Sequence, residues 1–244
     1  MIVKKYGGSA LATPQQILII ADQIAQSLKI KHEPMIIVVS AMGNTTDTLL
    51  KMGRDLFDKA SARELDMLIS AGERISMSMM TIALQKLGIS AISFTGSQAG
   101  IMTSNKHGYA YIKEIKPIRI EDELKNKKVV VIAGFQGVDP ITKEVTTLGR
   151  GGTDTTAVAL AAHFKARQCE LYKDVDGILN GPPNEFKKAK LIKELDYDCL
   201  LSLCYWGSKV VQSRAVELAK KYKVPLAIGS WKTNCLGTLV KNLD

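Results

Sequence analysis

The segment from Thr147 to Ala157 gathers residue types that can bind an anion. Its eleven residues include three glycines, four threonines, Arg150 and Asp154, and an apolar helical pattern follows from Val158 to Phe164. Glycines let backbone N–H groups crowd around an anion, and a helix N-terminus adds the positive end of its dipole. Arg150 matches a carboxylate or phosphate bidentately, and Asp154 could hold a metal, a lysine or a nucleophile. The segment alone is also compatible with a capped helix after a glycine-rich turn, because Thr and Asp are ordinary N-caps.

A second glycine loop, Lys5-Tyr-Gly-Gly-Ser9, follows a short apolar strand near the N-terminus. A strand, a glycine turn and a helix form the geometry that cradles phosphates. The spacing matches neither the Walker A loop nor the GxGxxG fingerprint, and such a loop is often only a turn. Two such loops, each at a strand–helix junction, favour a phosphate site.

The length and composition of the chain limit which classes of protein it can belong to. The chain has 244 residues, of which 46% are hydrophobic, enough for one large α/β domain or two small ones. No run of about eighteen apolar residues occurs, so we expect no membrane partner. The four cysteines lack CxxC spacing and no signal pattern begins the chain, which favours a cytoplasmic location. The three histidines are scattered, and we expect no metal site built from protein side chains.

The formal charge of +9 raises the possibility of a nucleic-acid partner. The lysines are spread over predicted helix surfaces and loops, aromatic residues make up only 6%, and no nucleic-acid motif occurs. Solvated helix faces account for most of the charge, and attraction of anionic substrates accounts for some. We therefore expect no nucleic-acid partner.

Apolar β-rich runs alternate with helical periodicity along the chain. The predicted strands are Ile2–Tyr6, Met35–Ser40, Ser90–Thr95, Val129–Gly134, Glu170–Lys173 and Pro225–Ile228. The predicted helices are Pro14–Leu28, Thr46–Leu56, Ala62–Leu87, Thr155–Phe164, Asp198–Cys204 and Ser208–Tyr222. This order predicts an α/β fold with three αβα layers and an open, mostly parallel central sheet, in one domain with two lobes. The stretch Ile101–Ile118 is less regular and predicts a hairpin outside that sheet.

Glycine, hydroxyl and charged residues gather where the predicted strands end, whereas the strand interiors are apolar. In an open α/β sheet, ligands bind outside the carboxyl ends of the strands. Backbone donors for phosphates, a lysine for developing charge and an organising acid are what phosphoryl transfer requires. The distribution therefore predicts a phosphoryl-transfer site.

Seven segments, spread in order over essentially the whole chain, resemble the catalytic domain of aspartate kinases, within the amino acid kinase superfamily. They are residues 5–9, 39–47, 70–76, 94–100, 134–137, 147–157 and 172–177. The most specific are Ser40-Ala-Met-Gly-Asn-Thr-Thr-Asp47 and Leu148-Gly-Arg-Gly-Gly-Thr-Asp154, whereas Lys5-Tyr-Gly-Gly8 is shared with acetylglutamate kinases. The resemblance implies ATP-dependent phosphorylation of the L-aspartate side-chain carboxylate, with Mg²⁺ as cofactor.

The resemblance also implies residue roles. Lys5 and Asp154 are the implied catalytic residues: the lysine stabilises the transferring phosphoryl group, and the aspartate organises it. Glu73 would meet the substrate ammonium and Arg150 a substrate carboxylate. The other implied substrate-binding residues are Ser40, Thr46, Gly151, Gly152 and Thr153. From the residues alone, Glu73 is also compatible with a solvent-facing acid at a helix break.

The implied nucleotide-binding residues lie in the N-terminal glycine loop and in the last third of the chain. They are Lys5, Gly7, Gly8, Ser9, Lys173, Asp174 and Lys209. Lys209 is also compatible with a surface lysine at a helix N-terminus. Many relatives have an aromatic residue and an arginine where this chain has Leu179 and Asn184, so weaker nucleotide affinity is expected.

For the whole chain we expect one catalytic domain over residues 1–244. Its substrate side would cover roughly residues 1–150 and its nucleotide side roughly 151–244, without an ACT regulatory domain. We expect a homo-oligomer, most simply a dimer, and a separate ACT-type regulatory subunit as a further possible partner. The residues Leu200, Leu201, Leu203 and Trp206 could mediate self-association or belong to the core.

Two other functions stay open from the sequence. Another acid kinase, such as an acetylglutamate or glutamate kinase, would keep the fold, but an N-acylated substrate would leave Glu73 without an ammonium. A degenerate, non-catalytic kinase subunit is the second, although Lys5, Arg150 and Asp154 are intact.

Overall fold

The central sheet is the frame on which the helices pack. The computed structural model describes residues 1–182, 186 and 188–243. The strand order is β12-β14-β13-β9-β1-β2-β6-β3, and the six strands from β13 to β3 are parallel. The strands are β1 (Ile2–Tyr6), β2 (Met35–Val39), β3 (Ala91–Phe94), β6 (Val129–Ala133), β9 (Cys169–Lys173), β12 (Glu194–Leu195), β13 (Leu226–Ser230) and β14 (Cys235–Val240). The predicted mostly parallel sheet is confirmed.

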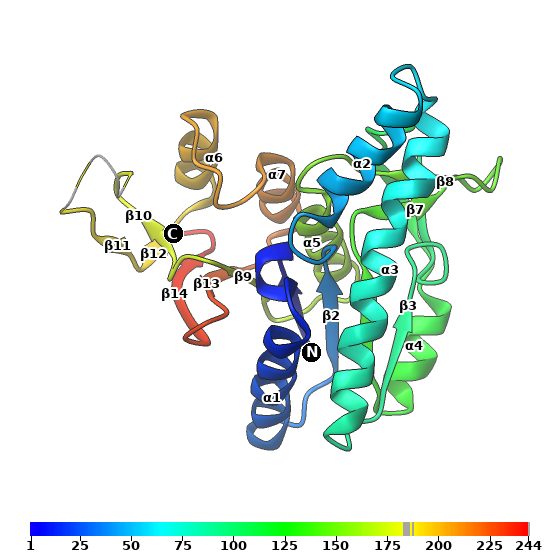
Figure 1. The fold of residues 1–244 in the computed structure, drawn as a ribbon. Coiled ribbons are helices and arrows are strands. Elements are labelled where there is room, and N and C mark those ends of the chain that lie inside the picture. The colour runs from blue at the N-terminus through cyan, green and yellow to red at the C-terminus, as the bar shows by residue number, and fades with distance from the viewer. Residues whose placement is uncertain (183–185, 187, 244) are drawn as a thin grey trace.

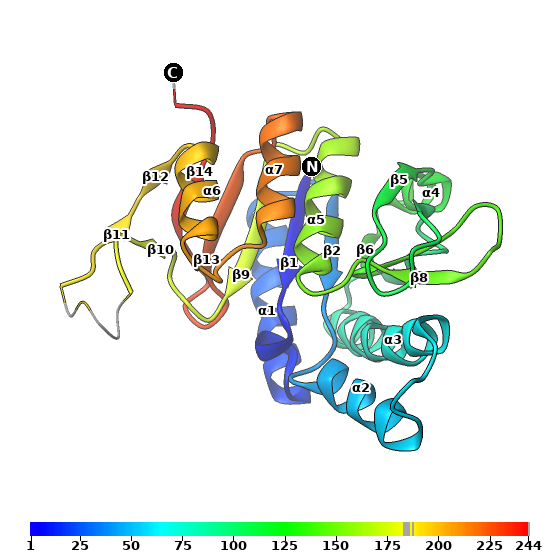
Figure 2. The same cartoon turned by 90° about the horizontal axis from the view of Figure 1, so that it is seen from above.

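Helices cover both faces of this sheet, so the molecule has three αβα layers (Figures 1 and 2). The helices are α1 (Pro14–Ile30), α2 (Thr45–Leu56), α3 (Ala62–Lys86), α4 (Ile118–Lys125), α5 (Gly152–His163), α6 (Tyr197–Tyr205) and α7 (Ser213–Tyr222), with a short 3-10 turn, η1, at Gly8–Leu11. Ile2 and Tyr6 pack with α1 and α3, whereas Val3 packs with α5 and α7. Alternate residues of β1 thus serve opposite cores, because successive side chains of a strand point to opposite faces.

Two small sheets flank the main one. One has the order β5-β4-β7-β8, from β4 (Ile101–Thr103), β5 (Ile112–Ile115), β7 (Gln136–Val138) and β8 (Val145–Thr147). The other pairs β10 (Ile178–Leu179) with β11 (Leu191–Ile192). Strands β4 and β5 pair antiparallel outside the central sheet, so the predicted hairpin within Ile101–Ile118 is confirmed.

Three expectations about elements were wrong or incomplete. The sequence did not predict α4, nor the strands β7, β8, β10, β11 and β12, whose two or three residues are too few to show periodicity. The predicted last helix also began at Ser208, whereas α7 begins at Ser213. Gly207 has a φ of +101°, and the chain then runs as an irregular connection in which Val211 is buried. A buried side chain in a loop cannot be recognised from helical spacing.

Candidate active site

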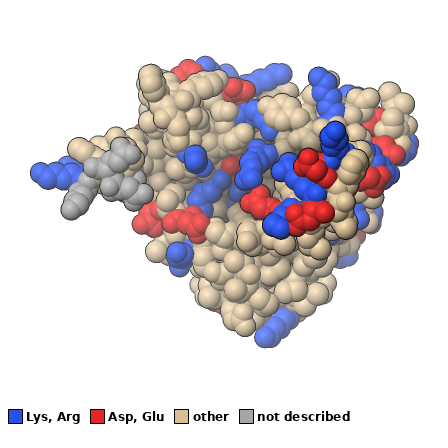
Figure 3. All heavy atoms as spheres, turned by 45° about the horizontal axis from the view of Figure 1, so that its top comes forward, with Lys and Arg blue, Asp and Glu red and all other residues tan. Residues whose placement is uncertain are grey.

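The carboxyl ends of the parallel strands bring the predicted residues to one edge of the central sheet. Strand β1, which carries Lys5, lies between β2 and β9, which end at Val39 and Lys173. The first turn of α5 supplies Asp154 at the same edge. Lysine and arginine side chains gather near the middle of this side of the molecule (Figure 3). The arrangement matches the predicted crevice for an anionic ligand.

Two lysines hold the buried carboxylate of Asp154. Lys5 Nζ lies 2.8 Å from Asp154 Oδ1, and Lys173 Nζ lies 2.7 Å from Oδ2. Burial by itself raises the pKa of Asp154, but the ammonium groups of Lys173 and Lys5 more than reverse this and hold the pKa well below its usual range. Burial lowers the pKa of Lys173 to about 8 although Asp154 acts in the opposite direction. The cluster has two cations for one anion, which suits a phosphate ligand.

The first glycine loop packs its backbone against neighbouring loops. A Cβ atom on Gly8 would lie 2.7 Å from Gly43 O and 2.8 Å from Ala41 O, and Gly43 N donates to Gly8 O at 2.8 Å. A Cβ on Gly7 would lie 3.5 Å from Lys5 Nζ. Gly7 therefore brings the backbone close to Lys5, and Gly8 lets the loop pack against the backbone that follows β2, an arrangement compatible with a phosphate cradle.

Ser9, the last residue of this loop, lies beside Asp174. Trp231 Nε1 donates to Asp174 Oδ1 at 2.8 Å. Burial raises the pKa of Asp174, but hydrogen bonds from Ser9 and Trp231 act in the opposite direction and help to bring the net pKa below its usual value. Asp174 is thus an ionised acceptor next to Lys173.

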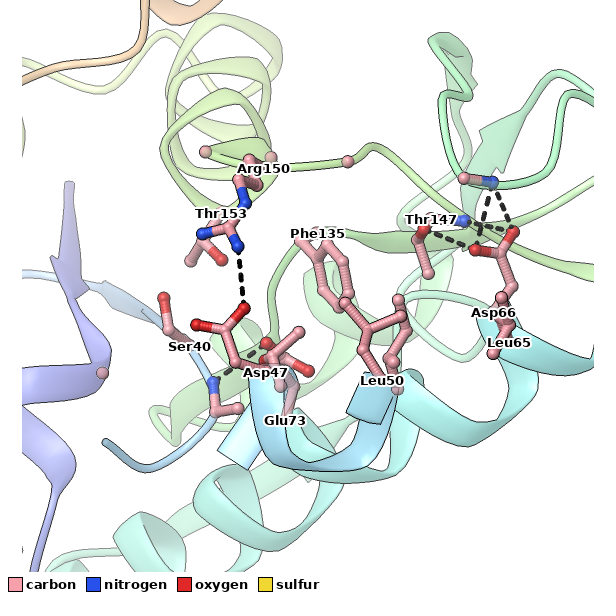
Figure 4. A pocket seen from close by; sticks show the side chains of 18 of the residues that line it. Ser40, Asp47, Leu50, Leu65, Asp66, Glu73, Phe135, Thr147, Arg150 and Thr153 are labelled. Atoms are coloured by element: carbon pink, nitrogen blue, oxygen red, sulfur yellow. Dashed lines mark hydrogen bonds and ion pairs between the residues drawn. The ribbon is translucent and has the colours of Figure 1, made fainter. Parts of the chain in front are cut away.

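One cavity of about 420 Å³ unites the predicted substrate-binding residues. All seven line it: Ser40, Thr46, Glu73, Arg150, Gly151, Gly152 and Thr153. They come from the β2–α2 connection, α2, α3 and the loop that opens α5 (Figure 4). Gly8 also lines the cavity, so the phosphate loop borders it.

Glu73 is a buried carboxylate with one unpaired oxygen in this cavity wall. It lies within the unbroken helix α3 and is 3% exposed, which excludes the solvent-facing acid at a helix break. Ala41 N donates to Oε1 at 2.9 Å, whereas Oε2 has no hydrogen-bond partner among the described residues. Burial raises the pKa of Glu73 to about 8, and the Ala41 hydrogen bond only partly offsets this. A cationic ligand group would satisfy the free oxygen and favour the ionised form.

Arg150 lies across the cavity mouth in the glycine loop. Gly149 and Gly151, on either side of it, have φ values of +74° and +75°, which glycine adopts without strain. The Arg150 side chain is 87% exposed, and its Nη2 lies 2.8 Å from Asp47 Oδ1 of α2 (Figure 4). An arginine on one side and an unpaired carboxylate on the other can read the opposite charges of a zwitterion.

A model of the amino acid kinase family matches residues 1–230. This chain belongs to the amino acid kinase family. Among curated relatives of this family, aspartokinase from Corynebacterium glutamicum is 44% identical over 240 residues, which are 98% of this chain and 57% of that protein. Aspartokinase from Geobacillus stearothermophilus is also 44% identical, over 99% of this chain and 59% of that protein. The chain therefore spans less than two thirds of the length of these relatives.

Solved structures of amino acid kinases share the fold. Aspartate kinase from Synechocystis superposes with a TM-score of 0.88 at 42% identity, over 99% of this chain and 40% of that chain. E. coli aspartokinase III, solved in complex with aspartate and ADP, gives a TM-score of 0.85 at 23% identity, over 100% of this chain and 65% of that one. The predicted family and fold class are thus confirmed.

Two predicted nucleotide features have no hydrogen bond or ion pair to the lysine cluster among the described residues, although Gln212 N of the α6–α7 connection donates to Asp154 Oδ2 at 3.4 Å. Lys209 lies exposed in the α6–α7 connection, and no hydrogen bond or ion pair joins it to another described residue. Because α7 begins at Ser213, Lys209 is not at a helix N-terminus either. Leu179 lies in β10, and Asn184 lies outside the described residues.

Asp66 and Asp47 were not predicted as site residues, although both line the cavity. Asp66 lies seven residues before Glu73 on α3, a spacing of about two helical turns that places both on one face. That spacing was a usable signal in the sequence. Trp231, which holds Asp174, carried no such signal because β13 brings it to the site from a distant part of the chain.

Among residues 1–182, 186 and 188–243, no group of three or more His, Cys, Asp or Glu side chains could hold a metal ion. No helix in the same described part of the chain is long and apolar enough to cross a membrane.

Proposed function

We propose that this chain is an aspartate kinase, which transfers the γ-phosphoryl group of ATP to the side-chain carboxylate of L-aspartate. The observation that carries the proposal is the unpaired, buried oxygen of Glu73 in the same cavity as Arg150. A substrate with both an ammonium and carboxylates complements this pair, whereas an N-acylated acid leaves Glu73 unpaired. The 44% identity with aspartokinases over nearly the whole chain supports the same substrate.

The lysine cluster supports binding of the nucleotide phosphates. Backbone N–H groups of the Gly7–Ser9 loop and the ammonium groups of Lys5 and Lys173 would hold phosphate oxygens, with Asp174 nearby. Mg²⁺ would neutralise phosphate charge when bound. The described residues offer no protein cage for it, so phosphate oxygens and water would supply most of its ligands.

The mechanism needs little covalent chemistry from the protein. A side-chain carboxylate oxygen of aspartate attacks the γ-phosphorus, a new P–O bond forms, and the bond to the β–γ bridging oxygen breaks to release ADP. The nucleophile is already an anion, so no general base is required. Lys5 would stabilise charge on the transferring group, and Asp154 would fix the position of Lys5 through their 2.8 Å contact.

The organisation of the domain is part of the proposal. Roughly residues 1–150 would form the substrate side and roughly 151–244 the nucleotide side, except that residues 5–9 would serve the nucleotide and residues 151–153 the substrate. We also propose cytoplasmic action and a homo-oligomer, most simply a dimer, with an ACT-type regulatory subunit as a possible partner. Leu200 of α6 is buried in the core, whereas Trp206 is 91% exposed. Leu201 and Leu203 are half-buried and pack against the same core, so Trp206 and its exposed neighbour Tyr205 would offer most of the apolar surface for self-association there.

An ATP-dependent hydroxylamine trap tests the substrate. The acyl phosphate product reacts with hydroxylamine to a coloured hydroxamate, and the panel should include L-aspartate, L-glutamate and N-acetyl-L-glutamate. We expect hydroxamate and ADP in equal amounts with aspartate. Product with only one of the other acids would contradict the proposal, and so would ADP release without hydroxamate.

A further inference from the structure

Asp66 is a buried carboxylate that joins three separate segments at the cavity wall. It is 1% exposed. Thr147 donates to it twice, from Oγ1 at 2.6 Å and from its backbone N at 3.1 Å. Gly108 N donates to both oxygens at 3.1 and 3.0 Å, and His107 Nδ1 lies 3.0 Å from Oδ2. Figure 4 shows the carboxylate facing Thr147 at the end of the cavity away from Arg150.

These contacts link the loop that carries Arg150 to the helix that carries Glu73. Thr147 ends β8 and precedes Arg150 by three residues, while Asp66 precedes Glu73 by seven residues on α3. The same helix therefore carries the carboxylate that would meet the substrate ammonium and holds the strand from which the loop with Arg150 starts. The helical rise of 1.5 Å per residue makes the Asp66–Glu73 spacing a rigid length of about 10 Å.

The loop from Thr147 to Gly151, here called the arginine loop, depends on such anchors because its glycines allow many backbone conformations. Gly149 and Gly151 flank Arg150, and glycine restricts backbone dihedrals least. Besides Thr147, the loop is held at Leu148, whose carbonyl accepts a 2.5 Å hydrogen bond from Arg214 Nη2. The Asp66 contacts thus hold the loop at Thr147, its first residue, which itself lines the substrate cavity.

We propose that Asp66 is a positioning residue that sets the separation of Arg150 from Glu73, and thereby the chain length of the amino dicarboxylate that the cavity selects. This inference rests on the proposed function. Asp66 acts through Thr147 and does not need to touch the substrate. Loosening its contacts lets the arginine loop shift, which weakens binding of aspartate and weakens discrimination against the longer glutamate.

Neighbouring threonines of β8 provide a matched test. Thr147→Val removes the side-chain hydrogen bond to Asp66 while preserving shape. Thr146→Val is the control, because Thr146 is equally buried and its Oγ1 hydrogen-bonds Thr103 Oγ1 at 2.7 Å, away from the cavity. A second pair is Asp66→Asn with Asp139→Asn, since Asp139 is a buried turn carboxylate that accepts from Ile141 N and Thr142 N outside the cavity.

The measurements are the aspartate KM, the ATP KM, kcat, the Ki of L-glutamate as a competitor, and the melting temperature. We expect Thr147→Val and Asp66→Asn to raise the aspartate KM about tenfold, as loss of a hydrogen bond to a charged group implies. Glutamate Ki should change less, so the ratio of glutamate Ki to aspartate KM should fall, and ATP KM should stay within about twofold. The two control variants should leave these ratios at the wild-type value.

A purely structural role for Asp66 would lower the melting temperature without changing the ratio of glutamate Ki to aspartate KM. An unchanged ratio in folded Thr147→Val, or an equal change in Thr146→Val, would overturn the inference while leaving the proposed function intact. Wild-type protein that forms no aspartate hydroxamate would overturn the proposed function, and the inference with it.

Discussion

Asp154 and Glu73 are both buried carboxylates of the candidate site, yet their surroundings shift their pKa values in opposite directions. Asp154 lies between two ammonium groups and its pKa is held low, whereas Glu73 has one hydrogen bond, one unpaired oxygen and a pKa raised to about 8. Both carboxylate oxygens of Asp154 already have a cationic partner without a ligand. Glu73 lacks a cation, and a ligand must bring it. Under the proposed function, the paired carboxylate of Asp154 would organise the catalytic groups, and the unpaired carboxylate of Glu73 would select the substrate.

The largest expected effect comes from removing a cation at Asp154. Lys5→Met should lower kcat by about 10²–10³-fold, because the lysine would act on charge that develops in the transition state. The aspartate KM should change much less, and steady-state kinetics separate the two. Lys4→Met is the control, since Lys4 is also buried and paired, with Glu170 at 3.4 Å, but lies on the other face of β1. Equal losses of kcat in both variants would show a general effect on folding.

The next effect tests the unpaired carboxylate. Glu73→Gln should raise the aspartate KM about ten- to a hundredfold, because a charged contact contributes roughly 1.5–3 kcal/mol. The kcat and the ATP KM should change far less, since the interaction would be made equally in the ground and transition states. Arg150→Ala should show the same pattern. A variant in which ATP binding is lost and aspartate binding kept would reverse the assignment of the two sides.

The raised pKa of Glu73 predicts a pH dependence. Below pH 8 the free site is mostly protonated at Glu73, and binding an ammonium requires the ionised form, so binding releases a proton. The aspartate KM should therefore fall about tenfold from pH 6 to pH 7 and level off above pH 8. Lys173 stays protonated between pH 6 and 7, so it adds little to this slope. The slope should vanish in Glu73→Gln; a slope that persists there belongs to another group.

The smallest effect concerns the ion pair of Arg150 with Asp47. Both side chains are largely exposed, at 87% and 58%, and exposed pairs contribute about 0.2–1 kcal/mol. Asp47→Asn should free the arginine and lower the aspartate KM by up to about fivefold. The aspartate KM of both proteins should be measured at 0.05 and 0.5 M salt. The difference between wild type and Asp47→Asn should be smaller at the higher concentration, because salt screens exposed charges. If Asp47→Asn instead raised the aspartate KM strongly, Asp47 would be a direct ligand rather than a competitor.

The sequence predicted the layers and indicated most candidate site residues because their signals are local. Six apolar runs became the six parallel strands, and the two glycine loops lie where those strands meet helices. The seven residues that the sequence marks as candidates for substrate binding line one cavity. Contacts over long sequence separations left no such signal: Asp66 meets Thr147, 81 residues later, and Trp231 meets Asp174, 57 residues earlier.

The sequence by itself determined which residue types stand at the strand ends, since apolar periodicity and glycine placement are properties of neighbouring residues. It determined the family for the same reason. Only the tertiary structure decided the charge states of those residues. A pKa depends on burial and on charges a few ångströms away, and here these come from distant segments: two lysines hold Asp154 ionised, while the packing of α3 behind Ala41 leaves Glu73 short of a partner.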